Sequence, residues 1–151
     1  MELNFRFATI RELDIYFKWA NDPLVRNYSF DNKPVPLDKH VEWFKSKLLS
    51  AECFLYFFTS DFVPAGQVRI ERSAEEIIIG ISVDEQFRGR SLSSRILTQA
   101  SDDFSKTHPG EKITAYIKTE NQASYKSFLR AGFSELEIVH VNGIKSYKLI
   151  K

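Results

Sequence analysis

The sequence predicts a mixed α+β fold in which a central mixed β-sheet of about seven strands is flanked by four helices. Three observations support this class. Short β-rich segments occur along the whole chain, longer segments place apolar residues at helical spacing, and two helices sit between strands late in the chain. With 151 residues, 43% of them hydrophobic, the chain can build one core, so we expect a single domain over residues 1–151.

The chain begins with a strand and a helix. Residues 3–8 alternate between apolar and polar side chains, which is typical of a strand. Thr9 stands three residues before Glu12, a capping-box spacing that predicts the start of a helix, whose apolar side comprises Ile10, Leu13, Phe17 and Ala20. This helix should end at Asn21-Asp22-Pro23, because the residue before a proline avoids helical angles.

A loop is expected over residues 28–36, and a second helix from about Leu37 with Val41, Phe44 and Leu48 at helical spacing. Three β-rich segments follow, at residues 54–59, 67–71 and 77–83, with a turn over residues 61–66 between the first two. The third has four β-branched residues within Ile77 to Ile81, so we expect it to be central and buried on both faces.

The last third alternates helices and strands. A helix opens within residues 89–94, and His108-Pro109-Gly110 stops it. After a strand at residues 113–117, a helix over residues 122–131 is closed by Gly132. Two final strands, residues 133–141 and 144–150, are joined by Asn142-Gly143, a strong signal for a two-residue hairpin.

Composition argues against several classes of protein. The net charge of +1 and the lack of a basic stripe argue against a nucleic-acid partner. No segment approaches the roughly 20 apolar residues of a membrane span, and the N-terminus does not resemble a secretory signal. Cys53 is the one cysteine, so no internal disulfide can form, and we expect the protein to be cytoplasmic. Because Cys53 lies in an apolar run, we expect its thiol to be buried and chemically inert.

The first functional signal lies between Ile81 and Ser91, where a buried strand, a polar turn and a helix start follow one another. The first N–H groups of a helix lack internal partners and carry the positive end of the helix dipole, so they can bind a pyrophosphate. Gly89 would let the backbone approach such a ligand closely, and Arg88 and Arg90 would add positive charge. The same pattern also fits an ordinary strand-to-helix connection with solvated arginines.

Two motifs carry a family resemblance. Residues 86–91, Gln-Phe-Arg-Gly-Arg-Ser, resemble the Q/R-x-x-G-x-G/A loop of the GNAT superfamily of N-acetyltransferases. Residues 121–133, Asn-Gln-Ala-Ser-Tyr-Lys-Ser-Phe-Leu-Arg-Ala-Gly-Phe, are similar to the N-x-x-S-x-x-x-Y-x-x-x-G-F helix that follows the fifth strand of that family. Because both motifs occur in the right order within a matching topology, the resemblance implies the GNAT acyl-CoA N-acyltransferase fold, with acetyl-CoA as cosubstrate and no metal.

The resemblance also implies roles for individual residues. Backbone groups near Val83 would pair with the pantetheine arm where the central strands splay apart, and the amides from Arg88 to Ser93 would hold the pyrophosphate. The expected coenzyme-binding residues are Val83, Arg88, Gly89, Arg90, Ser91, Leu92, Ser93, Asn121, Ser124 and Phe128. Two of these depart from the pattern. Ser91 replaces a glycine or alanine, and Phe128 stands where many members carry a tyrosine proposed as the general acid.

The resemblance implies that the N-terminal third of the chain shapes the acceptor site. Residues 19–26 and 40–44 resemble the W-x-N-D-P-x-V-R and H-x-x-W-F patterns of GNAT enzymes that acetylate nucleotide-linked amino sugars, as in pseudaminic-acid pathways. Residues 66–69, Gly-Gln-Val-Arg, also resemble the third strand of these amino-sugar enzymes. The Asn-Asp-Pro part also occurs in enzymes that acetylate ribosomal-protein N-termini. A sugar needs hydrogen-bonding side chains and aromatic platforms, and a diphosphate would suit Arg26 or Lys33. The expected acceptor residues are Asn21, Arg26, Phe30, His40, Trp43 and Gln67.

Structural roles for these acceptor residues stay open. Trp43 could pack in the core, His40 could cap its helix or face solvent, and Asn21 with Asp22 could simply end the first helix.

The expected reaction is direct attack of a free amine on the thioester, with the oxyanion held by a backbone N–H near Val83. Tyr125 is the first candidate for the acid that protonates the thiolate, and Tyr116 is the second. Ser82 and Gln67 could orient a water, and Glu42 or His40 could act as the base.

Two alternatives remain open. The enzyme could transfer the acetyl group to a protein N-terminus or an antibiotic amine, or the chain could be a non-catalytic GNAT module that only binds acyl-CoA. The C-terminal hairpin could also support a homodimer.

Overall fold

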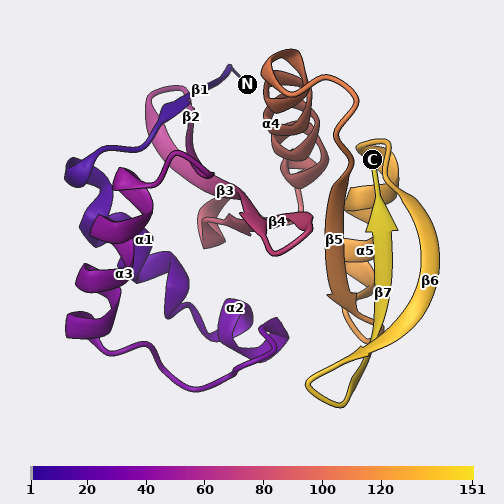
Figure 1. Ribbon diagram of the computed structural model, residues 1–151. Helices are drawn as coiled ribbons and strands as arrows, with labels where there is room; N and C mark the ends of the chain where they lie inside the picture. Colours follow the sequence, from indigo (N-terminus) through magenta and orange to yellow (C-terminus); the bar gives the residue numbers. More distant parts are fainter. Residues whose placement is uncertain (1) are drawn as a thin grey trace.

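The computed structural model describes residues 2–151, and within them seven strands form one mixed sheet accompanied by five α-helices (Figure 1). The strands are β1 Leu3–Phe7, β2 Cys53–Ser60, β3 Val63–Ser73, β4 Glu76–Val83, β5 Ile113–Lys118, β6 Ser134–Val141 and β7 Ile144–Ile150. The helices are α1 Leu13–Ala20, α2 Pro23–Tyr28, α3 Leu37–Leu49, α4 Leu92–Thr107 and α5 Gln122–Arg130. The spatial order of the strands is β1-β2-β3-β4-β5-β7-β6.

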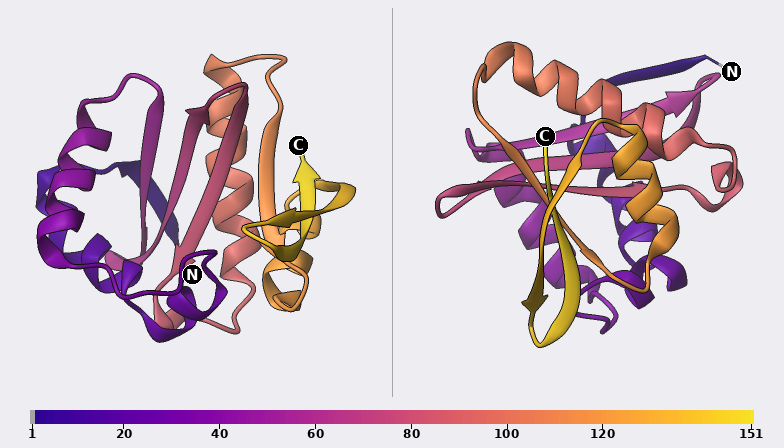
Figure 2. Two further views of the ribbon diagram at one scale, coloured as in Figure 1. Left: turned by 60° about the horizontal axis from the view of Figure 1, so that its bottom comes forward. Right: turned by 90° about the vertical axis from the view of Figure 1, so that its right-hand side faces the viewer.

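Helices cover both faces of this sheet. Figure 2 shows α4 and α5 on one face and the indigo and purple N-terminal helices on the other. The α4 face holds the larger core, in which Ile96, Leu97 and Phe104 of α4 pack against buried residues of β3, β4 and β5. A second core on the opposite face joins Tyr16, Trp19 and Phe44 to Leu55 and Phe57 of β2.

The sheet opens between its two central strands. All neighbouring strands are antiparallel except β4 and β5, which run parallel and pair at only two positions, Ile77 with Ile113 and Ile78 with Thr114. Beyond these pairs the strands diverge toward the C-terminal end of β4. The backbone groups of β4 near Val83 are therefore not taken up by a ladder with β5, which leaves a gap in the sheet for a ligand.

Most predicted elements are confirmed, including the stop of α4 at His108 and the left-handed Asn142-Gly143 hairpin turn. One helix was missed: Asn21-Asp22-Pro23 ends α1 but also starts α2, because Asp22 caps the new helix and Pro23 occupies its first position. The predicted turn over residues 61–66 was too long, since β3 already begins at Val63.

Two burial predictions were wrong. The buried side of α1 carries Tyr16 and Trp19, whereas Ile10 is exposed, because the helix packs on β2 through its aromatic residues. β4 is central, but it is buried mainly on the α4 side, and Ile78 and Gly80 on its other face line a cavity. Within the described residues, we find no helix long and apolar enough to cross a membrane.

Candidate active site

Two cavities meet at the C-terminal end of β4. One, of about 830 Å³, lies over the β4 face that is not covered by α4, and we call it the acceptor cavity. The other, of about 540 Å³, lies between β4 and the N-termini of α4 and α5, and we call it the coenzyme cavity. Both are lined by Val25, Ser29, Ile81 and Ser82. A molecule in each cavity would therefore meet the other beside Ser82.

The coenzyme cavity brings together most of the predicted coenzyme-binding residues. Its lining includes Val83, Arg88, Gly89, Ser91, Leu92, Ser93, Asn121 and Ser124. Asn121 caps α5, and its side-chain oxygen accepts a hydrogen bond from the backbone N–H of Ser124 at 3.2 Å. The two sequence motifs thus form opposite walls of one cavity.

The loop before α4 is built to leave amides available. Ser91, the residue before the helix, has a left-handed backbone (φ 57°), and its side chain makes no capping hydrogen bond to the first turn. Gly89 is also left-handed (φ 75°), and a Cβ placed there would have no atom within 4 Å. A helix start with uncapped amides and an open approach is a suitable site for phosphate groups.

The N-terminal helices hold this loop in place. The Arg88 guanidinium lies 2.8 Å from Asp22 Oδ1, and the same Asp22 oxygen accepts from the amide of Leu24 at the start of α2. On the other side, the Trp19 indole donates to Asp84 Oδ2 at 2.9 Å, and the Gln86 amide donates to Asp84 Oδ1 at 3.0 Å. We call residues 84–91, between β4 and α4, the coenzyme loop. Two carboxylates, Asp22 and Asp84, therefore couple this loop to α1 and α2.

Both carboxylates have pKa values below their ordinary range. Burial acts to raise the pKa of Asp84, but the hydrogen bonds from Trp19 and Gln86 and the charge of Lys18 outweigh it. Burial likewise acts to raise the pKa of Asp22, and the contact with Arg88 outweighs it. A carboxylate with a lowered pKa stabilises the fold above its unfolded pKa, about 3.9, and this stabilisation is lost as the pH falls through the folded value.

We therefore expect the free energy of unfolding to fall as the pH drops below about 4. Asp84→Asn should lower the free energy of unfolding at neutral pH by about 1–3 kcal/mol, because the buried partners of the carboxylate lose their charged acceptor. Its stability should also vary less with acid than that of the parent protein. Urea unfolding from pH 3 to 7 measures both effects, and Asp14→Asn on the exposed side of α1 is the control. An unchanged acid dependence in Asp84→Asn would contradict this assignment.

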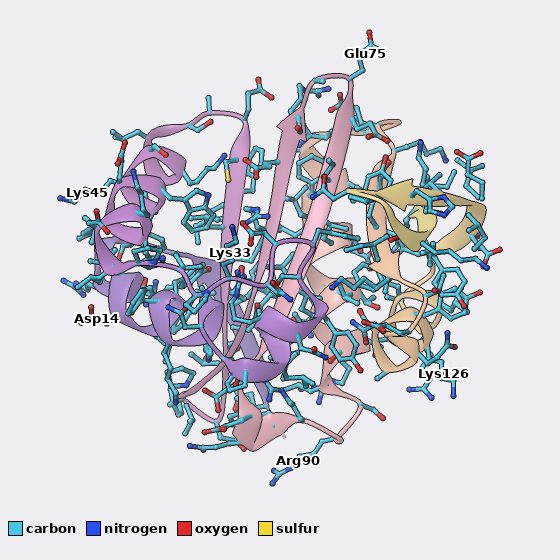
Figure 3. The ribbon with its side chains drawn as sticks, turned by 90° about the horizontal axis from the view of Figure 1, so that it is seen from below. Asp14, Lys33, Lys45, Glu75, Arg90 and Lys126 are labelled. Atoms are coloured by element: carbon cyan, nitrogen blue, oxygen red, sulfur yellow. The ribbon has the colours of Figure 1, made fainter. Side chains whose placement is uncertain are left out.

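Three predicted residues lie outside the coenzyme cavity. Arg90 points away from the protein (Figure 3), with its guanidinium 5.9 Å from the centre of the Phe87 ring. Phe128 is 3% exposed and packs edge-on against Phe133 in the larger core. Tyr125 stacks on Tyr147 at 4.0 Å and donates to Glu135, which raises its pKa. This position on the β6–β7 side does not support Tyr125 as the acid, and the phenol that lines the coenzyme cavity belongs to Tyr28 of α2.

The acceptor cavity contains three of the predicted acceptor residues with their side chains free for a ligand to approach: Phe30, Trp43 and Gln67. Gln67 on β3 pairs with Ser82 on β4, and its amide donates to Ser82 Oγ at 3.1 Å. The Arg69 guanidinium lies over the Trp43 ring at 5.4 Å from its centre. An amide-hydroxyl pair therefore stands at the junction of the cavities, and a cationic-aromatic platform lies beside it.

The other predicted acceptor and base residues have structural positions. His40 is 2% exposed and its Nε2 lies 2.9 Å from the Leu13 carbonyl oxygen, so it ties α3 to α1. Asn21 bonds both backbone groups of Val35, and Glu42 is exposed on α3 outside both cavities. Arg26 lines the acceptor cavity, but its guanidinium donates to the carbonyl oxygens of Ala20, Asp31 and Lys33 and to Ser29 Oγ. Arg26 thus organises the loop after α2 rather than offering its charge to a ligand.

Sequence reasoning missed several residues that line the acceptor cavity. Arg69, Glu76, Gly80 and Lys148 reach it from β3, β4 and β7. Gly80 leaves the middle of the sheet without a side chain, since a Cβ there would meet only Arg69 Nη2 at 3.9 Å. The sequence of β4 contains a signal for this cavity, because positions 76, 80 and 82 on one face of the strand are polar or glycine, which indicates a face that is not packed in the core. Among the described residues, no group of three His, Cys, Asp or Glu side chains could hold a metal ion.

The fold and this pair of cavities define an acyl-CoA-dependent N-acetyltransferase. The model of the acetyltransferase (GNAT) domain matches residues 2–134, and the chain belongs to this family.

Solved structures show the same fold. The spermidine N-acetyltransferase from Vibrio cholerae, in complex with CoA and spermine, is 15% identical with a TM-score of 0.86, and the match covers 99% of this chain and 94% of that one. An aminoglycoside acetyltransferase in complex with coenzyme A is 16% identical (TM-score 0.81, 99% and 94% covered), and an N-acetyltransferase from Staphylococcus aureus is 19% identical (0.80, 99% and 96%). No curated protein sequence matches the chain.

Proposed function

We propose that this GNAT N-acetyltransferase transfers the acetyl group of acetyl-CoA to the amino group of a nucleotide-linked amino sugar, a step of surface-polysaccharide biosynthesis. The supporting observation is the charge of the acceptor cavity. Its described lining carries the carboxylates Asp31 and Glu76 and the cations Arg26, Arg69 and Lys148, so carboxylates are not in excess even though the Arg26 guanidinium is engaged by backbone carbonyl groups. A polycation such as spermine needs an excess of carboxylates, whereas a diphosphate needs an accessible cation.

Arg69 is the cation best placed for such a diphosphate. Glu71 is the carboxylate that it contacts, at 3.0 Å, but Lys47 shares that carboxylate at 2.6 Å, so two cations are balanced by one anion. The guanidinium also borders the open floor at Gly80. We infer that the Trp43–Arg69 platform receives the diphosphate and the sugar ring, with the amino group directed to the junction at Ser82.

At the junction the reaction forms a C–N bond and breaks the thioester C–S bond, one proton leaves the amine and the thiolate takes one up. Ser82 accepts a hydrogen bond from Gln67, so its own hydroxyl proton stays available to orient the amine or a water. The coenzyme cavity would hold acetyl-CoA with its pyrophosphate at the α4 amides and Gly89. The two cavities bring the reactants together, which supplies much of the acceleration.

A panel of acceptors tests the substrate class. With acetyl-CoA saturating, we expect a UDP-linked amino sugar to be acetylated with a kcat/KM at least about a hundredfold above those of spermine, an aminoglycoside and an N-terminal peptide. A higher kcat/KM for spermine or the peptide would reject the amino-sugar proposal and leave the acetyltransferase assignment in place.

Gly80→Leu tests whether the acceptor cavity is the acceptor site. A side chain at this position has room next to the backbone, and leucine would occupy the floor of the cavity. We expect the acceptor KM to rise at least about tenfold, because the ligand loses contacts worth more than about 1.4 kcal/mol, while the Kd for acetyl-CoA stays the same. Steady-state kinetics and calorimetry measure the two constants. A normal acceptor KM would place the acceptor elsewhere.

A further inference from the structure

Three side chains from three different strands converge in the acceptor cavity away from the junction. The Tyr116 hydroxyl on β5 donates to the Glu76 carboxylate on β4, with both oxygens at 2.6 Å. The Lys148 ammonium on β7 lies 3.2 Å from Glu76 Oε2 and 5.8 Å from the centre of the Tyr116 ring. We call Glu76, Tyr116 and Lys148 the distal cluster. All three line the acceptor cavity. Tyr116, the second candidate for the acid, donates its hydroxyl proton to Glu76 and does not line the coenzyme cavity, so the reaction at the junction uses none of the three.

The distal cluster is separated from the junction by most of the length of β4. Glu76 is the first residue of β4 and Ser82 stands six residues later, so their Cα atoms are about 20 Å apart at about 3.3 Å per residue. Figure 3 shows the neighbouring Glu75 at one end of the molecule and Arg90 of the coenzyme loop at the other. A ligand that contacts both Ser82 and Glu76 must therefore be elongated.

The carboxylate of the cluster can accept further hydrogen bonds. The side chain of Glu76 is 36% exposed and that of Lys148 is 23% exposed. An ionised carboxylate offers about four acceptor positions, and Tyr116 and Lys148 leave part of them free. The hydrogen bond from Tyr116, reinforced by Lys148, holds the pKa of Glu76 below its ordinary value, so the group is ionised at neutral pH.

The surroundings favour a neutral hydrogen-bond donor over a cation as the ligand of Glu76. Lys148 already neutralises the carboxylate, so a second ammonium would meet Lys148 at close range. Neighbouring hydroxyl groups, in contrast, can donate to free carboxylate positions without adding charge. The Trp43–Arg69 platform lies between the cluster and the junction, since Arg69 pairs in register with Gly80.

We propose that the distal cluster binds the nucleoside end of the acceptor, with the Glu76 carboxylate accepting hydrogen bonds from the ribose hydroxyls. This inference rests on the proposed function, because it takes a nucleotide-linked amino sugar as the acceptor. It adds the direction in which that acceptor lies: the nucleoside at the start of β4, the diphosphate near Arg69, and the amino group at Ser82. The site then selects acceptors by length as well as by charge.

The test uses UDP, which has the nucleoside and diphosphate but no sugar, titrated by calorimetry into the protein saturated with CoA. Glu76→Gln keeps the shape of the side chain and removes its charge. We expect it to raise the Kd of UDP at least about tenfold, the loss of about two charge-assisted hydrogen bonds, and to leave the Kd of CoA unchanged. Glu75→Gln is the matched control, because Glu75 is exposed in the turn before β4 and should not alter UDP binding.

A kinetic comparison adds a second readout. Glu76→Gln should raise the KM for a UDP-linked amino sugar and leave the KM for the free amino sugar unchanged, since the short acceptor does not reach β4's first residue. UDP that does not bind, or that binds Glu76→Gln as well as the parent protein, would overturn the distal site even if the nucleotide-linked sugar is acetylated. UDP that binds through Glu76, with no acetylation of any nucleotide-linked amino sugar, would instead overturn the proposed function alone.

Discussion

Gly89→Glu is expected to weaken acetyl-CoA binding at least about a hundredfold without unfolding the protein. Gly89 is left-handed and borders the coenzyme cavity, with no atom within 4 Å of an added Cβ. The new side chain meets no neighbouring atom, and the strain of a side chain on a left-handed backbone, about 1–2 kcal/mol, is shared by the Gly110→Glu control below. What distinguishes Gly89→Glu is a carboxylate brought to the amides expected to hold the pyrophosphate. Placing like charges together costs several kcal/mol, and about 2.7 kcal/mol already corresponds to a hundredfold in affinity.

Thermal unfolding with and without acetyl-CoA measures this effect together with calorimetry. Ligand at about 100 times its Kd adds roughly 2.7 kcal/mol to the parent protein, which raises its Tm by several degrees, and Gly89→Glu should lose this rise. Gly110→Glu is a matched control, because Gly110 is also left-handed with an open Cβ position but lies in the turn after α4. Equal acetyl-CoA affinity in the two variants would show that the Gly89 loop does not bind the pyrophosphate.

Gly66→Ala is expected to cause the largest loss of stability, about 3 kcal/mol, or roughly 6–12 °C in Tm. Gly66 on β3 pairs with Val83 on β4. A Cβ at this position would lie 2.6 Å from the Ser82 carbonyl oxygen and 3.3 Å from the Ile96 side chain. The first contact is with the backbone of a central strand, which cannot rotate away, so the strands must separate at the junction of the two cavities.

Gly80→Ala is the control for this substitution, because it adds the same methyl group to the neighbouring strand. Its nearest contact is Arg69 Nη2 at 3.9 Å, an ordinary distance, so the free energy of unfolding should change by less than about 1 kcal/mol. Urea unfolding of both variants gives the comparison. If Gly66→Ala is as stable as Gly80→Ala, the close approach of β3 and β4 is not a constraint on the fold.

The main boundaries of the fold could be read from local patterns. Period-two and helical spacing place the strands and the long helices, since each depends on residues a few positions apart. The errors arose where local signals were absent or had two meanings. Asp61 and Phe62 form a tight left-handed turn without glycine, so the turn was extended past Pro64. Asp22-Pro23 was interpreted as the end of one helix although the same pair also begins another.

The candidate site also has one part that could be predicted from local sequence patterns and one part that could not. The coenzyme motifs are contiguous in sequence, and eight of the ten predicted residues line one cavity. The lining of the acceptor cavity comes from N-terminal helices, a loop and several strands, so the side chains could not be assigned to core, loop or cavity in advance. His40 and Arg26 suit a ligand in composition, yet both are held by backbone carbonyl groups of the N-terminal segment.

The sequence by itself determined the family, the order of the elements apart from α2, and the position of the loop that borders the coenzyme cavity, because each is encoded by residues close together in the chain. The tertiary structure alone decided which side chains face the acceptor. It turned Tyr125 toward Glu135, buried Phe128, and brought Glu76, Tyr116 and Lys148 together from three strands. The physical reason is that strand register and the divergence of β4 from β5 set the face and direction of each side chain, and both depend on contacts between segments far apart in sequence.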